Sequence, residues 1–136
     1  TEAATPEALS APMLALGPVL KRLAPGGRVV TVSRPASSAG SPAAAATRQG
    51  VDGVLRSLAK ELRGGATGNG VVVADGVPVT APSVAGALRF LLSGRSAYVD
   101  GQLLQVTADS GTLPADWERP LDGRVAVVTG AARGIG

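Results

Sequence analysis

Short runs of aliphatic and β-branched residues alternate with longer segments of helical periodicity along most of this 136-residue chain. The runs are GRVVTVS (residues 27–33), GVVVA (70–74) and GQLLQV (101–106). Their length and composition are typical of buried strands. Strands that alternate with amphipathic helices form parallel sheets, because each helix returns the chain to the edge where the next strand begins. The sequence therefore predicts a doubly wound, parallel α/β sheet.

The first helix is predicted to begin at Thr5, a capping residue that is followed by Pro6 and Glu7. Apolar residues then recur every three or four positions as far as residue 23, so they share one face. Pro12 and Pro18 fall inside this segment. Because proline cannot donate to the helical ladder, we expect the two prolines to kink or split the helix.

Two further helices are expected at residues 47–64 and 82–94. Each has an apolar stripe at spacings of three and four, and each is followed by a glycine that stops it. On the earlier helix, Asp52 and Arg56 lie four positions apart. At this spacing the two side chains are expected to form a favourable surface pair.

A glycine-rich motif follows a fourth predicted strand, RVAVVT (residues 124–129). In TGAARGIG, Gly130 allows a tight exit turn, Gly134 lets the backbone approach a pyrophosphate, and Gly136 lets a helix pack on the strand. Such a turn normally leads into a helix whose first amides hold the phosphates. The alternative is a strand and turn with a structural role alone. The predicted cofactor-binding residues are Gly130, Ala132, Arg133, Gly134, Ile135 and Gly136.

Composition excludes several other kinds of site. The chain has no cysteine and no histidine, which rules out disulfides and histidine-based catalytic triads and argues against a metal site.

The net charge of +3 comes almost wholly from single, scattered arginines, and aromatic residues make up only 2% of the chain. A nucleic-acid surface would show a clustered basic stripe with aromatic residues. No apolar run reaches the roughly 18 residues of a membrane span, and we expect a cytoplasmic protein that binds neither nucleic acid nor membrane.

A change in composition at residues 107–123 divides the chain. The segment TADSGTLPADWERPLDG contains two prolines and the only tryptophan, Trp117, which we expect to pin this linker to a domain surface. The predicted organisation is a partial Rossmann-like or flavodoxin-like domain (1–106), the linker, and the first strand of a second Rossmann domain (124–136). The chain lacks an initiator methionine and stops at the glycine motif, so we expect it to be an internal piece of a longer protein.

The motif LDGRVAVVTGAARGIG resembles the opening of the short-chain dehydrogenases/reductases. GRVVTVS, AAAATRQGVDGVLRSLAKEL and SAYVDGQLLQV resemble consecutive pieces of the same family's C-terminal half. The resemblance implies a nicotinamide cofactor, NADH or NADPH, and hydride transfer to or from a carbonyl or alcohol.

Members of this family use a serine, and a tyrosine with a lysine four residues later. Laid onto this chain, the serine position falls at or near Arg34, beside Ser33. The tyrosine position falls at Ala44 and the lysine position at Arg48. Alanine has no transferable proton, and arginine cannot act as a tuned amine. We therefore expect no catalytic residue in this chain.

The remaining hydroxyl groups do not replace the missing ones. Ser33, Ser37 and Ser38 lie near the serine position, where bonds to local backbone are the preferred interpretation and a retained catalytic serine is the alternative. The only tyrosine, Tyr98, has Gln102 four residues later instead of a lysine. We expect Tyr98 to serve in packing.

The layout of a degenerate domain, a linker and the start of an intact reductase domain is similar to that of the high-molecular-weight 3-oxoacyl-[acyl-carrier-protein] reductases. KELRGGAT, LLSGRSAYVDGQ and PADWERPLDGRVAVVTGAARGIG carry this resemblance. It implies that the parent protein is a homodimer or larger homo-oligomer and reduces a 3-oxoacyl thioester of acyl carrier protein or CoA in fatty-acid synthesis. The alternatives are another short-chain reductase with a different carbonyl substrate, and a non-catalytic structural or dimerisation module.

Overall fold

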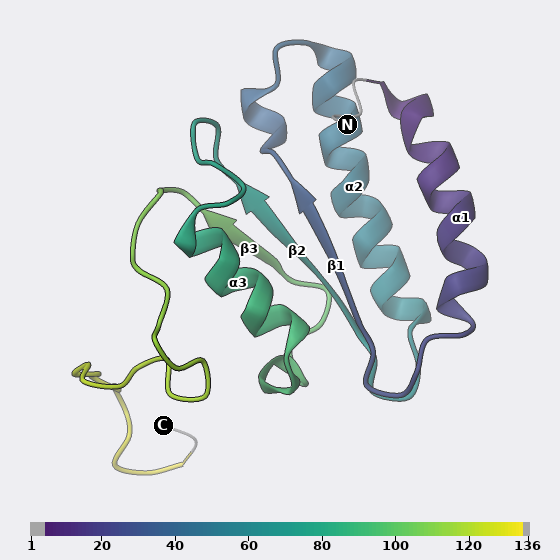
Figure 1. The fold of residues 1–136 in the computed structure, drawn as a ribbon. Coiled ribbons are helices and arrows are strands. Elements are labelled where there is room, and N and C mark those ends of the chain that lie inside the picture. Colours follow the sequence, from purple (N-terminus) through teal and green to yellow (C-terminus); the bar gives the residue numbers. More distant parts are fainter. Residues whose placement is uncertain (1–4, 135–136) are drawn as a thin grey trace.

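A three-stranded parallel sheet lies at the centre of residues 5–134, the part of the chain that this computed structural model describes (Figure 1). The strands β1 (Arg28–Ser33), β2 (Thr67–Val73) and β3 (Leu103–Val106) follow one another across the sheet in chain order. Val71 is the register partner of both Val32 and Leu104, so β2 is the central strand. The parallel α/β fold, a partial Rossmann-like sheet, is confirmed.

Two helices cover opposite faces of this sheet: α2 (Pro42–Glu61) and α3 (Pro82–Leu92). A Cβ atom on Gly70 of β2 would lie 3.1 Å from Leu55 of α2. The next residue, Val71, belongs to the cluster that includes Val84 of α3. Because alternate residues of a strand point to opposite faces, the two helices flank the sheet.

The opposite placement of the helices has a consequence for topology. Both connections, β1–α2–β2 and β2–α3–β3, advance across the sheet in the same direction. Two crossovers that advance together but pass over opposite faces must have opposite hands, so one of them is left-handed. Left-handed crossovers between parallel strands are rare, at about 2% of cases.

The burial of the strands is less uniform than the sequence predicts. Every residue of β2 is buried, whereas β1 and β3 are only partly covered, and Val32 is 47% exposed. The difference follows from position, since β1 and β3 form the two edges of the sheet in the described part of the chain.

The helix preceding β1 differs in detail from the prediction. A 3₁₀ turn, η1 (Pro6–Leu9), leads into α1 (Ser10–Leu20), and the Thr5 side chain makes no capping bond. The α-helix continues through Pro18 to its end two residues later, so a split at this proline is wrong and a kink there stays a prediction. Pro12 lies in the first turn of α1, where backbone N–H groups have no partner within the helix, and its missing donor costs nothing there.

The second helix begins five residues earlier than predicted. The side-chain oxygen of Ser41 accepts a 3.2 Å hydrogen bond from the Ala44 backbone N–H, and Pro42 occupies the first turn. A short 3₁₀ turn, η2 (Ala36–Ser38), occupies the preceding loop. The alanine run after Pro42 therefore forms the start of α2, in agreement with the high helix propensity of alanine.

Residues 124–129 form no strand, which contradicts the sequence prediction. Val125 and Val127 are 96% and 89% exposed. An isolated strand is unstable in water, and no strand in the described part of the chain pairs with this segment. No helix within residues 5–134 has the length and apolar character needed to cross a bilayer.

Candidate functional site

The glycine-rich segment lies away from the sheet. Gly130 and Gly134 have φ angles of 73° and 74°, a left-handed conformation that glycine adopts without strain. Nothing within residues 5–134 approaches either position closely enough to touch an added Cβ. Ala132 and Arg133 are also exposed. The predicted site residues Ile135 and Gly136 lie outside the described residues.

The described part of this segment, residues 124–134, does not form a cofactor cradle. A dinucleotide site of this type needs a buried strand before the glycines and the N-terminus of a helix after them. Residues 124–129 form no strand, and no helix follows them in the described part of the chain. Binding of a nicotinamide cofactor at these six positions therefore stays a prediction.

The carboxyl end of the sheet, where open α/β sheets bind their ligands, is bridged by an arginine. Arg34 directly follows β1, and its half-buried side chain crosses to the end of β2. Its Nη1 donates hydrogen bonds of 2.7 Å to the carbonyl oxygen of Ala74 and 2.8 Å to that of Val77. The residue at the expected serine position thus ties two loops together.

Ala44 and Arg48, at the expected tyrosine and lysine positions, lie in the first turns of α2. The Arg48 Nη1 donates a 3.0 Å hydrogen bond to the carbonyl oxygen of Pro35 and a 3.4 Å bond to the Ser38 hydroxyl oxygen. The Ser38 hydroxyl itself donates to Pro35 at 3.1 Å. These contacts hold the loop before α2 in place, and the local bonding expected of Ser38 is confirmed.

The tyrosine and lysine of the family are absent from positions 44 and 48. Ala44 offers only a methyl group, and a guanidinium stays charged across the physiological pH range. No group of three or more potential metal ligands occurs within residues 5–134. The arrangement fits a structural role for Arg34 and Arg48.

Tyr98 does not pack, contrary to the sequence prediction. Its side chain is fully exposed, with a relative accessibility of 101%. The residue follows η3 (Gly94–Ser96), in a turn that directs Val99 toward the core instead. Neither packing nor proton transfer with Gln102 is supported at this position.

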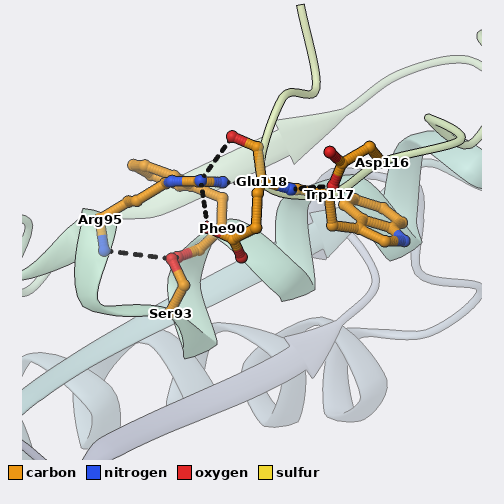
Figure 2. Close-up of polar contacts among 6 residues, drawn as sticks. All are labelled: Phe90, Ser93, Arg95, Asp116, Trp117 and Glu118. Atoms are coloured by element: carbon orange, nitrogen blue, oxygen red, sulfur yellow. Dashed lines mark hydrogen bonds and ion pairs between the residues drawn. The ribbon is translucent and has the colours of Figure 1, made fainter.

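Two arginines, Arg89 of α3 and Arg95 of η3, hold the linker in place, and Figure 2 shows the contacts of Arg95. Arg95 donates hydrogen bonds to the carbonyl oxygens of Trp117 at 2.7 Å and Glu118 at 2.9 Å, and forms a 3.0 Å ion pair with the Glu118 carboxylate. The Cζ atom of Arg89 lies 4.3 Å from the centroid of the Trp117 ring. The expectation that Trp117 pins the linker to a domain surface is confirmed.

Sequence reasoning identified the tryptophan but missed the two arginines. Arg89 lies near the end of α3 and Arg95 in η3, and both are more than twenty positions before Trp117. A single sequence carries no signal for a pairing over that separation. An arginine on the exposed side of a helix is as easily explained by solvation alone.

Comparisons with known proteins agree with the fold. No protein-family model and no curated protein matches the chain. Among solved structures, it is similar to a 3-oxoacyl-[acyl-carrier protein] reductase with bound NAD from Brucella melitensis, at 25% identity and a TM-score of 0.55. The match covers 73% of this chain and 46% of that one. The fold is Rossmann-like.

A second solved structure is similar to a comparable degree. It is the promiscuous reductase LugOII, which catalyses keto-reduction at C1 during lugdunomycin biosynthesis. The identity is 24% and the TM-score 0.60, over 70% of this chain and 42% of that one. The chain thus spans less than half the length of these solved proteins. The likeness shows that the chain shares the fold of these proteins.

Proposed function

We propose that this chain supplies a non-catalytic, Rossmann-like part of an NAD(P)H-dependent 3-oxoacyl-[acyl-carrier-protein] reductase of the high-molecular-weight type. In this proposal residues 1–106 belong to a degenerate domain and residues 107–123 are the linker. Residues 124–136 begin the catalytic domain, where Gly130, Gly134 and Gly136 would lie against the cofactor. The parent enzyme is then a cytoplasmic protein of fatty-acid synthesis.

The observation that carries this proposal is the identity of the residues at the family's three catalytic positions. Arg34 is committed to carbonyl oxygens at the end of β2, and Arg48 is bonded to the loop before α2. Ala44 cannot move a proton. A sheet that keeps the family's order of elements but replaces all three groups supports a domain that has kept its fold and lost its chemistry.

A structural role is supported by the surface of α1. This helix is apolar nearly all round, yet none of its residues is buried, and Leu14 and Val19 are 78% and 55% exposed. Helices apolar on every side are ordinarily covered. We propose that this part of the protein packs on the catalytic domain or on a second copy, in a homodimer or larger oligomer.

The test uses the longer reductase that this proposal implies. Purified enzyme is given NADPH or NADH with acetoacetyl-CoA, with acetoacetyl carrier protein, and with a cyclic ketone of the kind reduced by other short-chain reductases. Preferred reduction of the thioesters supports the proposal, and preferred reduction of the cyclic ketone supports the alternative substrate class. Absence of a Tyr-x-x-x-Lys motif and of any turnover would leave a binding module and contradict the reductase function.

A further inference from the structure

A cavity of about 310 Å³ lies between α3 and the linker. Its walls are mostly apolar. Phe90 and Gly86 contribute from α3, while Pro114, Trp117 and Pro120 contribute from the linker. A volume of this size, with apolar walls and a few polar groups, falls at the lower end of the range found for small-molecule sites.

The cavity's acidic residue is already neutralised. Glu118 forms its ion pair with Arg95, which also donates to two backbone carbonyl oxygens of the linker (Figure 2). The guanidinium of Arg95 is therefore used in holding the wall of the cavity. The Glu118 carboxylate is in turn occupied by Arg95.

Arg89 is the second cation in the lining, and its charge has no such partner. Its guanidinium lies over the Trp117 ring, and within residues 5–134 it makes no hydrogen bond and no ion pair. Stacking on an indole orients the guanidinium plane but leaves its N–H groups able to donate. A fixed guanidinium with unused donors matches the paired oxygens of a carboxylate or phosphate.

We propose that this cavity binds a small organic anion, with a flat apolar body against Phe90 and the prolines and a carboxylate or phosphate on Arg89. The apolar walls account for the body, and the uncompensated charge of Arg89 accounts for the anionic group. Because the linker forms one wall, an occupant would contact both α3 and the linker. This site is separate from the glycine motif and does not depend on the reductase function.

The full 136-residue chain is titrated with three probes of matched body: 2-naphthoate, 2-naphthyl phosphate and the neutral 2-naphthamide. Calorimetry gives the dissociation constants. The single tryptophan gives one indole N–H resonance, so nuclear magnetic resonance reports whether each probe binds next to Trp117. We expect at least one of the two anions to shift this resonance and to bind about tenfold tighter than the amide. Comparison of the two anions distinguishes a carboxylate ligand from a phosphate ligand.

Two variants locate the effect. Arg89→Gln is expected to abolish the preference for the anions while the amide binds as before. Glu118→Gln removes a carboxylate from the lining but keeps the backbone oxygen that Arg95 also uses, so anion affinity is expected to rise about threefold. Equal binding of anions and amide, absence of binding, or an unmoved indole resonance would overturn the proposal. So would an unchanged anion affinity in Glu118→Gln, a result that does not require the Arg89 variant to fold.

Discussion

The guanidinium of Arg34 donates a 2.7 Å hydrogen bond to the carbonyl oxygen of Ala74, across the carboxyl end of the sheet. This contact joins the loop after β1 to the loop after β2, forty positions apart in the chain. In a working Rossmann-like enzyme the same edge is kept open for ligand. Here a residue that the family resemblance places at a catalytic position has become a brace between strand ends.

Replacement of Arg34 by alanine is expected to destabilise the domain. The change leaves the half-buried carbonyl oxygens of Ala74 and Val77 without a charged donor, at a cost of about 2 kcal/mol. Chemical denaturation monitored by circular dichroism measures the free energy of unfolding. The matched control is Arg124→Ala, at an exposed position, and it should change stability by less than about 0.5 kcal/mol. Equal effects of the two substitutions would contradict the bracing role.

The chain itself is expected to show no reductase activity. Ala44 offers no proton, and Arg48 is committed to the loop at Pro35. Acetoacetyl-CoA with NADPH or NADH should therefore be consumed no faster than without protein. In the longer reductase that we propose, Arg48→Ala should leave kcat/KM nearly unchanged. A loss of more than tenfold, about 1.4 kcal/mol of transition-state stabilisation, would show that Arg48 takes part in binding carrier protein or phosphate.

Nicotinamide cofactors are expected to bind this chain weakly or not at all. The glycines are present, but within residues 5–134 neither a paired strand nor a following helix surrounds them, so the amides that hold a pyrophosphate are not assembled. Isothermal titration with NADH and with NADPH measures the affinity. A dissociation constant in the micromolar range would show that the segment organises itself around the cofactor.

The central strand illustrates how far a single sequence predicts this fold. The apolar run in GVVVA predicts a buried strand, but β2 begins three residues earlier, with Thr67, Gly68 and Asn69. Gly68 and Asn69 are poor strand formers. They are recruited by tertiary contacts: the Asn69 amide donates to the Val99 carbonyl oxygen at 2.8 Å and accepts from the Gln102 backbone N–H at 3.0 Å. The strand propensities of these residues do not predict such hydrogen-bond partners.

The site shows the same limit in another form. The glycine spacing and the loss of the catalytic pair at Ala44 and Arg48 are visible in the sequence, because both are local patterns. The brace made by Arg34 and the stack of Arg89 on Trp117 join residues distant in the chain, and neither was predicted. The strand expected at residues 124–129 is wrong for a related reason, since strand propensity does not supply a neighbouring strand.

Asp52 on α2 makes stability depend on pH in a specific direction. Partial burial raises the pKa of its carboxyl group above the usual 3.8, and the positive charge of Arg56 offsets only part of this effect. A raised pKa in the folded state means that the folded protein favours the protonated form. The associated stability is present below pH 3.8 and is lost as pH rises through the folded-state pKa. The attraction between Asp52 and Arg56 that the spacing predicts is therefore present, but it is smaller than the cost of burying the ionised carboxylate.

Asp52→Asn is accordingly expected to stabilise the protein at neutral pH. The free energy of unfolding is measured by denaturation at pH 7 and again below pH 3.8. The gain over the parent chain should be present at pH 7 and disappear at the lower pH. Asp109→Asn, at an exposed position in the linker, is the control for the loss of a surface charge. A variant less stable than the parent at pH 7 would mean that attraction to Arg56 outweighs the cost of burial.

Substitution of two glycines with similar backbone conformation tests cofactor binding separately from backbone strain. Gly123 and Gly134 have φ angles of 71° and 74°, and an added Cβ at either would touch no other group. Valine at either position therefore meets the same backbone strain. In the longer reductase that we propose, Gly134→Val is expected to abolish binding of NADH and NADPH, because the valine side chain would stand where the backbone approaches pyrophosphate. Gly123→Val should retain binding, and both variants should keep the α/β domain folded, as judged by circular dichroism. Equal loss of cofactor affinity in both variants would attribute the effect to strain and remove Gly134 from the predicted site.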